Sequence, residues 1–213
     1  MNKIIDCYGI NVHYSENTNG AGLELRHDCI NAIQTFTHGR KFKRCYEWCS
    51  GPAFLGYSIL GNNMCETLCL SDIFPLAITQ STQTAVENDL LDAVTIYQSD
   101  NWKNIPIDEK FDLIIANPPH FDVINYWNER WNYEQRIYLD KGWNIHKEFF
   151  AGVSQHLIED GSIILLENAW GSGVNTFQKM IDDAGLKVVG HFLSEFKMDS
   201  IGRPIYYIHI KHS

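Results

Sequence analysis

The sequence predicts an α/β fold in which helices cover both faces of a mostly parallel, seven-stranded sheet. Short apolar runs of strand length alternate with segments of helical periodicity along most of the 213 residues. Four of these runs end at or just before a polar side chain of a kind that binds ligands, namely Glu47, Asp72, Asp100 and Asn117. Open α/β sheets bind ligands at the carboxyl ends of their strands, so the four side chains are expected at one edge.

Residues 1–43 are expected to form an N-terminal extension packed on the main domain, which comprises residues 44–213. Within this extension, the sequence pattern predicts two short strands over 4–8 and 10–14, a polar turn over 16–20 and a helix over 28–36.

The first strand of the sheet is expected at 43–48, with a tight loop over 49–52 and a helix over 53–60. A loop that enters a helix N-terminus directs backbone N–H groups and a partial positive charge at an anion. As an alternative, Gly51 and Gly56 only allow the helix to pack closely on the strand.

The next two strands, 67–71 and 94–98, each precede an acidic residue. Asp72 stands where dinucleotide-binding folds place a carboxylate that accepts hydrogen bonds from ribose hydroxyls. Two alternatives are open. Asp72 caps the helix expected over 74–90, and Asp100 forms a turn.

The most specific motif is Asn117-Pro118-Pro119-His120, directly after the apolar run 111–116. Neither proline has an N–H to donate, and the first biases Asn117 toward extended backbone. The loop therefore offers acceptors. The side-chain oxygen of Asn117 and the backbone oxygen of Pro118 can take both hydrogens of an NH2 group and stabilise the positive charge that develops when its nitrogen is methylated. An ordinary strand-ending turn is the alternative.

With these residues the chain resembles the class I methyltransferases that depend on S-adenosylmethionine (SAM). The similar branch has an Asn-Pro-Pro-aromatic motif and methylates glutamine amides or adenine N6. The resemblance covers roughly residues 44–211 and implies a Rossmann-like sheet with a reversed last strand. It implies SAM as cofactor, with its carboxylate at the 49–52 loop, its ammonium facing Glu47, its ribose at Asp72 and its adenine amine at Asp100. The expected SAM-binding residues are Glu47, Cys49, Gly51, Asp72, Ile73, Asp100, Asn101 and Asn117, and Asn117 and Pro118 are expected to be catalytic.

The chain departs from this family at two places. The family usually has three glycines at alternate loop positions, which here read Cys49, Gly51 and Ala53. His120 replaces an aromatic residue that stacks on the acceptor, and Phe121 is then expected to take over the stacking. A nicotinamide-binding Rossmann protein ranks behind, because the chain lacks Gly-x-Gly-x-x-Gly and that function gives the Asn-Pro-Pro motif no role.

The rest of the chain continues the α/β alternation. Helices are expected over 143–157 and 176–184, and strands over 162–167, 187–193 and 205–210. The connection over 199–204 is short enough for a hairpin, which reverses the last strand.

An aromatic segment lies between Phe121 and Trp143 and is expected to cover the acceptor as a lid. The residues expected to contact the acceptor are Pro119, His120, Phe121, Trp127 and Trp131. A subunit interface is the alternative, and the sequence indicates no oligomeric state.

Composition bears on partners and location. The net charge of −9 disfavours a nucleic-acid acceptor, and the basic cluster 40–44 is interpreted as a solvated loop with a local phosphate contact as the alternative. The six cysteines lack C-x2-C pairs, so no metal site is expected. No membrane span or signal peptide is apparent, which favours a reduced, cytoplasmic location.

We therefore expect a SAM-dependent N-methyltransferase that acts on a planar nitrogen of a protein side chain, glutamine-like, or of a small metabolite. Adenine N6 in RNA or DNA is the alternative acceptor. The alternative of another class is a SAM-binding scaffold that lacks catalysis.

Overall fold

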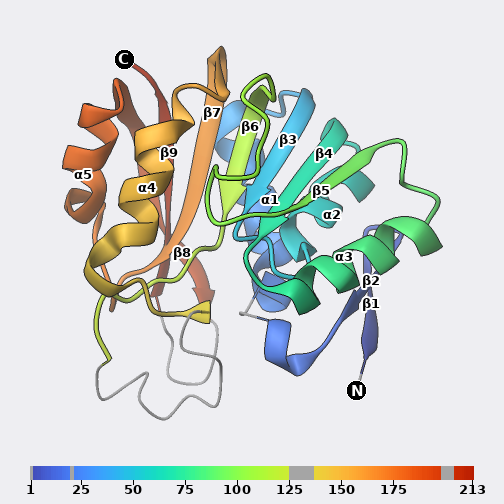
Figure 1. Cartoon of the computed structure of the whole chain (residues 1–213). Helices are drawn as coiled ribbons and strands as arrows, with labels where there is room; N and C mark the ends of the chain where they lie inside the picture. The colour runs from blue at the N-terminus through green and yellow to red at the C-terminus, as the bar shows by residue number, and fades with distance from the viewer. Residues whose placement is uncertain (1, 20–21, 125–136, 198–203) are drawn as a thin grey trace.

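The computed structural model describes residues 2–19, 22–124, 137–197 and 204–213, and it contains a seven-stranded sheet in the order β5-β4-β3-β6-β7-β9-β8 (Figure 1). The strands are β3 (Phe42–Trp48), β4 (Cys65–Asp72), β5 (Val94–Gln98), β6 (Phe111–Ala116), β7 (Leu157–Asn168), β8 (Leu186–Lys197) and β9 (Pro204–His212). Strands β3 to β7 pair in parallel, and β9 is antiparallel to both β7 and β8. The predicted fold class, including the reversed last strand, is confirmed.

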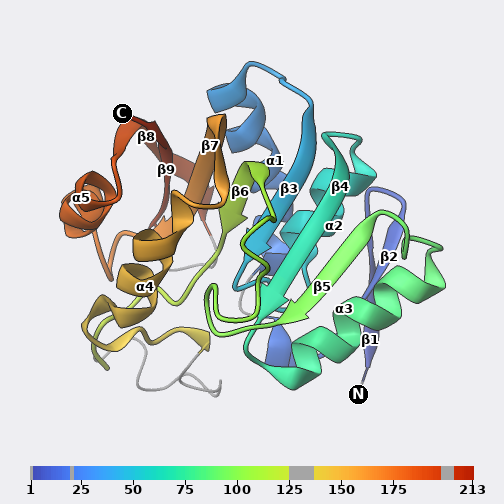
Figure 2. The ribbon, with the colours of Figure 1, turned by 45° about the horizontal axis from the view of Figure 1, so that its top comes forward.

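Helices cover both faces of this sheet because alternate strand residues point to opposite faces. In β3, Cys45 belongs to a core shared with α1 (Gly22–Thr37) and α2 (Phe54–Gly61), whereas Tyr46 belongs to a core shared with α4 (Asn144–Val153) and α5 (Val174–Asp183). Figure 2 shows α4 and α5 on the side of the sheet opposite α1 and α2.

The hairpin formed by β1 (Lys3–Cys7) and β2 (Ile10–Tyr14) packs against α3 (Pro75–Glu87) (Figure 1). The His13 backbone N–H donates to Thr84 Oγ1 at 2.9 Å. Next along the chain, the 3-10 helix η1 (Glu16–Thr18) is tied to α3, because Thr18 Oγ1 donates to Gln80 Oε1 at 2.7 Å. The N-terminal residues thus reach the middle of α3, where the next residue, Ser81, donates to the Gly51 carbonyl in the loop after β3. The division of the chain at residue 43 stays a prediction.

Three predicted helices differ in extent from the observed ones. Helix α1 begins at Gly22 and not at residue 28, because buried Leu25 continues the apolar spacing of Cys29 and Ile33. The helix expected over 74–90 spans 75–87, ending where the Asn88 side chain donates to the Thr84 carbonyl.

The helix expected over 143–157 consists of η3 (Lys141–Trp143) followed by α4, which ends at Val153. Leu157 begins β7 instead, where it pairs with Phe111 ahead of a register shift. No helix within the described residues is long and apolar enough to cross a membrane.

Candidate active site

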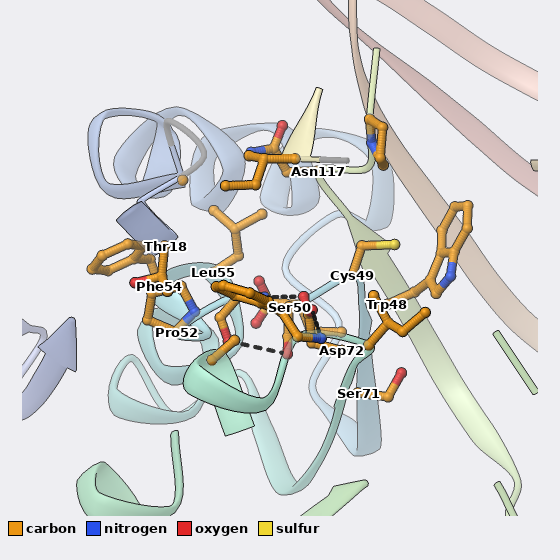
Figure 3. A pocket seen from close by; sticks show the side chains of 18 of the residues that line it. Thr18, Trp48, Cys49, Ser50, Pro52, Phe54, Leu55, Ser71, Asp72 and Asn117 are labelled. Carbon is orange, nitrogen blue, oxygen red and sulfur yellow. Dashed lines mark hydrogen bonds between the residues drawn. The ribbon is translucent and has the colours of Figure 1, made fainter. Parts of the chain in front are cut away.

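A cavity of about 260 Å³ lies at the carboxyl ends of β3, β4, β5 and β6 (Figure 3). This volume is just below the range of about 300–1,000 Å³ that is usual for small-molecule sites. In Figure 3, Asn117 lies at one edge of the cavity, and Ser71 and Asp72 lie at the other. Nine predicted residues line it, namely Glu47, Cys49, Gly51, Asp72, Ile73, Asp100, Asn101, Asn117 and Pro119. The structure brings these residues together, and the ligand group that each one contacts stays a prediction.

The loop after β3 has left-handed backbone at alternate residues. The φ angles are +54° at Cys49, +52° at Gly51 and +67° at Ala53. These are the three positions at which the similar methyltransferases usually have glycine. The glycine spacing therefore corresponds to a backbone path, which this chain keeps while two side chains accept a conformation that disfavours a Cβ.

The sequence predicts that the backbone N–H groups of this loop face an anion, but three of them donate to protein oxygens. Ser50 N donates to the Ser71 carbonyl at 2.9 Å, and Ala53 N donates to the Ser50 carbonyl at 2.7 Å. Gly51 N donates to Asp72 Oδ2 at 2.8 Å. These three donors are directed at protein oxygens because the loop folds back on β4, so the expected use of them for a carboxylate is not seen.

Glu47 is a buried carboxylate under the N-terminus of α2. Its side chain lines the cavity, and Oε2 accepts the Gly56 N–H at 2.7 Å. A Cβ at position 56 would lie 2.6 Å from Oε2, so glycine is needed there for this contact. Burial, followed by the negative charge of Asp72, raises the pKa of Glu47 to about 8 against the opposing N–H bonds of Gly56 and Leu55. Such a group suits a cationic ligand.

Asp72 connects the loops that follow β3 and β4. Its Oδ2 accepts the Gly51 N–H and its Oδ1 accepts the Phe74 N–H, both at 2.8 Å. Phe74 is the N-cap residue of α3, so Asp72 acts just before the cap and not as the cap itself. One carboxylate thus lines the cavity and fixes the two loops around it.

The loop after β5 supplies Asp100 and Asn101. Asp100 is about half exposed and forms an ion pair with Lys103. Asn101 has a φ of +51°, and its Oδ1 accepts the Trp48 Nε1–H at 2.9 Å. Asn101 therefore ties this loop to the end of β3, while Asp100 stays accessible at the cavity.

Behind Asn117, four side chains form a continuous hydrogen-bonded series, which we call the histidine–carboxylate chain (Asp140, His146, Glu167 and His120). His120 Nε2 lies 2.9 Å from Asn117 Oδ1, and its Nδ1 lies 3.0 Å from Glu167 Oε2. His146 Nε2 lies 2.9 Å from Glu167 Oε1, and its Nδ1 lies 2.6 Å from Asp140 Oδ2. The three inner members are at most 1% exposed.

The inner members of this chain carry opposite charges. Burial lowers the pKa of His146, but the carboxylates of Glu167 and Asp140 outweigh burial and raise it to about 9. Burial works in the other direction on both carboxylates, and contacts with His146 nevertheless hold the pKa values of Glu167 and Asp140 below their ordinary values. The series is a buried ion network with an end at Asn117.

Other predicted acceptor residues lie differently. Pro118 and His120 are outside the described lining of the cavity, as is Phe121, which is 1% exposed. Burial of Phe121 leaves it little surface for stacking on an acceptor. Trp127 and Trp131 lie outside the described residues, as does most of the predicted lid.

Two parts of the wall have no counterpart in the sequence predictions. Thr18, Asn19 and Gly22 line the cavity from the N-terminal segment, and Ile137 and Ile145 line it from the far side. The polar composition of residues 16–20 indicates a turn but not what the turn faces. Only the docking of the hairpin onto α3 brings it to the cavity.

Gly171, in the loop after β7, touches the backbone of the Asn-Pro-Pro-His loop. A Cβ at this position would lie 1.9 Å from the His120 carbonyl oxygen and 3.0 Å from its carbon. Backbone atoms cannot yield as a flexible side chain does, so this contact requires glycine.

Comparisons with known proteins find similarity to methyltransferases. Residues 32–129 match the family model described as the methyltransferase small domain. A ribosomal protein uL3 glutamine methyltransferase of Francisella tularensis is 27% identical over 124 residues, which are 55% of this chain and 38% of that protein. A ribosomal RNA small subunit methyltransferase C of Actinobacillus pleuropneumoniae is 28% identical over 139 residues, which are 65% of this chain and 36% of that protein. The chain thus spans little more than a third of the length of these relatives.

Solved structures establish the fold. A T. thermophilus 16S rRNA N2 methyltransferase in complex with AdoMet and guanosine superposes with a TM-score of 0.63 at 12% identity, covering 100% of this chain and 50% of that one. An N-methyltransferase from Bradyrhizobium japonicum superposes with a TM-score of 0.58 at 14% identity, covering 92% and 98%.

Proposed function

We propose that this chain is a SAM-dependent methyltransferase that transfers a methyl group to the nitrogen of a planar amide or amine. One observation carries the proposal. Asn117, at the carboxyl end of β6, lines the same cavity as Glu47 and Asp72 from β3 and β4. The matched family, described as a methyltransferase domain, supports the methyl-transfer part of the proposal.

The cavity fits SAM through the chemistry of its carboxylates. Glu47 is buried, and no cationic side chain within the described part of the chain is among the charges that shift its pKa. It is suited to the ammonium of the methionine moiety. Asp72 is assigned to the ribose hydroxyls, and Asp100 to the adenine amine at the more open end. When bound, SAM supplies a methyl group on a sulfonium that leaves as a neutral thioether.

On the acceptor side, the Asn117 side-chain oxygen and the Pro118 backbone oxygen are assigned to the two hydrogens of the NH2 group. With both hydrogens held there, the nitrogen lone pair would be free to take the methyl group as the S–C bond of the sulfonium breaks, and the nitrogen would carry a positive charge until it lost a proton. Fixed acceptors stabilise that charge as it develops and need no prior deprotonation of the amide.

A protein glutamine-like amide is the preferred acceptor. One relative is named a glutamine methyltransferase, and the net charge of −9 does not favour phosphate binding. A base amine in RNA is the second candidate, since other relatives are named ribosomal RNA methyltransferases. Because these relatives act on ribosomal components and the six cysteines have free thiols, we place the protein in the cytoplasm.

The test is transfer of a labelled methyl group from SAM to a cell extract separated into protein, nucleic acid and small molecules. We expect label in the protein fraction, with a rate that changes little between 50 and 200 mM salt. An RNA acceptor held by six to ten phosphate contacts would lose about 10³- to 10⁵-fold in affinity over that range. Label in RNA with this steep salt dependence would select the second candidate, and no SAM binding by calorimetry would overturn the proposal.

A further inference from the structure

The wall of the cavity includes a stretch of the N-terminal segment that is held in place by α3. Thr18, Asn19 and Gly22 line the cavity, and Figure 3 shows Thr18 on the same side of it as Phe54. Thr18 is 5% exposed, and its hydroxyl donates to Gln80 Oε1 at 2.7 Å. Gln80 lies outside the described lining of the cavity. A buried residue of the wall is therefore fixed by a side chain behind the wall.

The N-terminal segment and α3 contact the same glycine from two directions. A Cβ at position 51 would lie 3.2 Å from the Thr18 carbonyl oxygen, so this oxygen packs directly against the Gly51 backbone. The hydroxyl of Ser81, which follows Gln80 in α3, donates to the Gly51 carbonyl at 3.1 Å. The Ser81 carbonyl accepts the Tyr57 hydroxyl at 2.6 Å, which ties α3 to α2. Gly51 is thus held between the N-terminal segment and these helices.

The loop around Gly51 needs such support because its backbone is strained. Cys49 and Ala53 have φ angles of +54° and +67°, which disfavour any residue that has a Cβ. Strained backbone persists only where the surrounding contacts over-determine it. A Cβ on Gly22 would lie 3.3 Å from Phe54 Cδ2, so the start of α1 packs against the residue that follows Ala53. The N-terminal segment therefore contacts the strained loop and the start of α2.

The position of this wall matters because the cavity offers no positive charge to the carboxylate of SAM. The described lining contains no Lys, Arg or His side chain. The N–H groups of Ser50, Gly51 and Ala53 donate to protein oxygens. Only neutral groups of the described lining are then left for that carboxylate. Their contacts act over hydrogen-bond distance, so they require a wall that is held in place.

We propose that Thr18 is a positioning residue of the cofactor site, which through its hydrogen bond to Gln80 fixes the N-terminal segment against Gly51 and keeps the cavity in the shape that binds SAM. The N-terminal residues are then part of the cofactor site and not only an extension packed on the domain. The inference rests on the proposed function in taking SAM as the ligand of the cavity.

The test is calorimetric titration of SAM into the full chain with substitutions in this contact. Gln80→Leu is the sharpest variant, because Gln80 is 4% exposed and lies outside the described lining, so a change in SAM affinity must be transmitted through the wall. We expect Gln80→Leu and Thr18→Val each to weaken SAM binding about 5- to 20-fold, as for loss of a buried hydrogen bond. Thr18→Ser keeps the hydroxyl and should restore most of the affinity.

Thr84→Val is the matched control for a purely structural effect. Thr84 is also a buried threonine whose hydroxyl oxygen joins the N-terminal hairpin to α3, since it accepts the His13 N–H at 2.9 Å, but it lies outside the described lining. The melting temperature of Thr84→Val should fall as that of Thr18→Val does, with SAM affinity unchanged at a temperature where every variant is folded. Equal losses of SAM affinity in these two variants would show that Thr18 has no special role in the site.

The double variant, Thr18→Val with Gln80→Leu, tests whether the two side chains act through one contact. We expect its loss of SAM affinity to match that of one single variant, because the same hydrogen bond is removed. Unchanged SAM affinity in both single variants, or losses that multiply in the double variant, would overturn the inference. Failure of the natural protein to bind SAM would contradict the proposed function instead, so the two failures are distinguishable.

Discussion

The two halves of the cavity differ in the groups that hold their polar side chains in place. In the half that we assign to the cofactor, here called the cofactor half and formed by the loops after β3, β4 and β5, backbone N–H groups of Gly56, Gly51 and Phe74 hold the side chains of Glu47 and Asp72. In the acceptor half, formed around the end of β6, Asn117 is held by side chains of the histidine–carboxylate chain. Backbone donors do not titrate, whereas the side-chain series has charges that must balance.

This difference predicts how each half responds to amino-acid substitutions. A substitution in the cofactor half removes a carboxyl group assigned to SAM and, at Asp72, its contacts with the Gly51 and Phe74 N–H groups, so it should alter mainly SAM binding and the stability of these loops. A site held by coupled charges transmits a change at one member to the others, because each is buried and paired. Substitutions in the two halves should therefore separate cofactor affinity from the rate of methyl transfer.

The largest expected effect is in the acceptor half. Asn117→Ala should lower kcat on the order of 10²-fold or more with SAM affinity nearly intact, since its carbonyl is assigned to charge that develops in the transition state. Steady-state kinetics and calorimetry measure the two quantities. Exposed Asn175 in α5 offers a control, and Asn175→Ala should alter neither. An equal loss of SAM affinity in Asn117→Ala would indicate a structural turn and erase the contrast between the halves.

Asp72→Ala comes next and should have the opposite profile. Loss of a charged acceptor costs about 1.5–3 kcal/mol, so SAM affinity is expected to fall roughly 10- to 150-fold, with a smaller effect on kcat at saturating SAM. Calorimetry gives the affinity. A melting curve without ligand shows how much of the loss comes from the Gly51 and Phe74 contacts. Unchanged SAM affinity would remove Asp72 from the cofactor site.

A pH effect is expected in the cofactor half at Glu47. Its pKa of about 8 means that the carboxyl carries a proton below this pH, and a proton must leave before the carboxylate can bind an ammonium. SAM affinity should therefore rise with pH between about 6 and 8, by up to about tenfold per pH unit for one proton. Calorimetry across this range measures the slope, and Glu47→Gln should abolish it. A flat profile in the natural protein would place the ammonium elsewhere.

The smallest effect concerns the backbone of the loop after β3. Ala53→Gly removes left-handed strain of about 1–2 kcal/mol and adds unfolded-state entropy of about 0.4–1 kcal/mol, so the free energy of unfolding should rise slightly, by at most about 1.5 kcal/mol. Gly51→Ala, at a φ of +52° with the Thr18 carbonyl 3.2 Å from the new Cβ, should lower it. Denaturant unfolding measures both. Destabilisation by Ala53→Gly would mean that packing of the buried methyl group outweighs the strain.

The two halves also differ in how far the sequence predicts them. Glu47, Asp72 and Asp100 each stand at or just after the end of an apolar run, and parallel pairing alone gathers such residues at one edge. The histidine–carboxylate chain joins residues that no local pattern connects. Glu167 is 47 positions from His120 and 21 from His146. The sequence predicts Glu167 only as the end of the strand over 162–167 and His146 only as part of the helix over 143–157, because hydrogen bonds between segments far apart in the sequence leave no local periodicity.

Gly171 limits which substitutions a protein with this fold can accept next to the Asn-Pro-Pro-His loop. Any side chain at that position would collide with the His120 carbonyl, and the displacement would reach Asn117 three residues earlier. Position 171 therefore accepts no residue other than glycine without a shift of the Asn-Pro-Pro-His loop. Differences in the acceptor that is bound would then arise at other residues that line the cavity, such as Asn19, Ile137 and Ile145. Related proteins that keep this glycine would then share the proposed reaction and differ in the acceptor molecules that they bind.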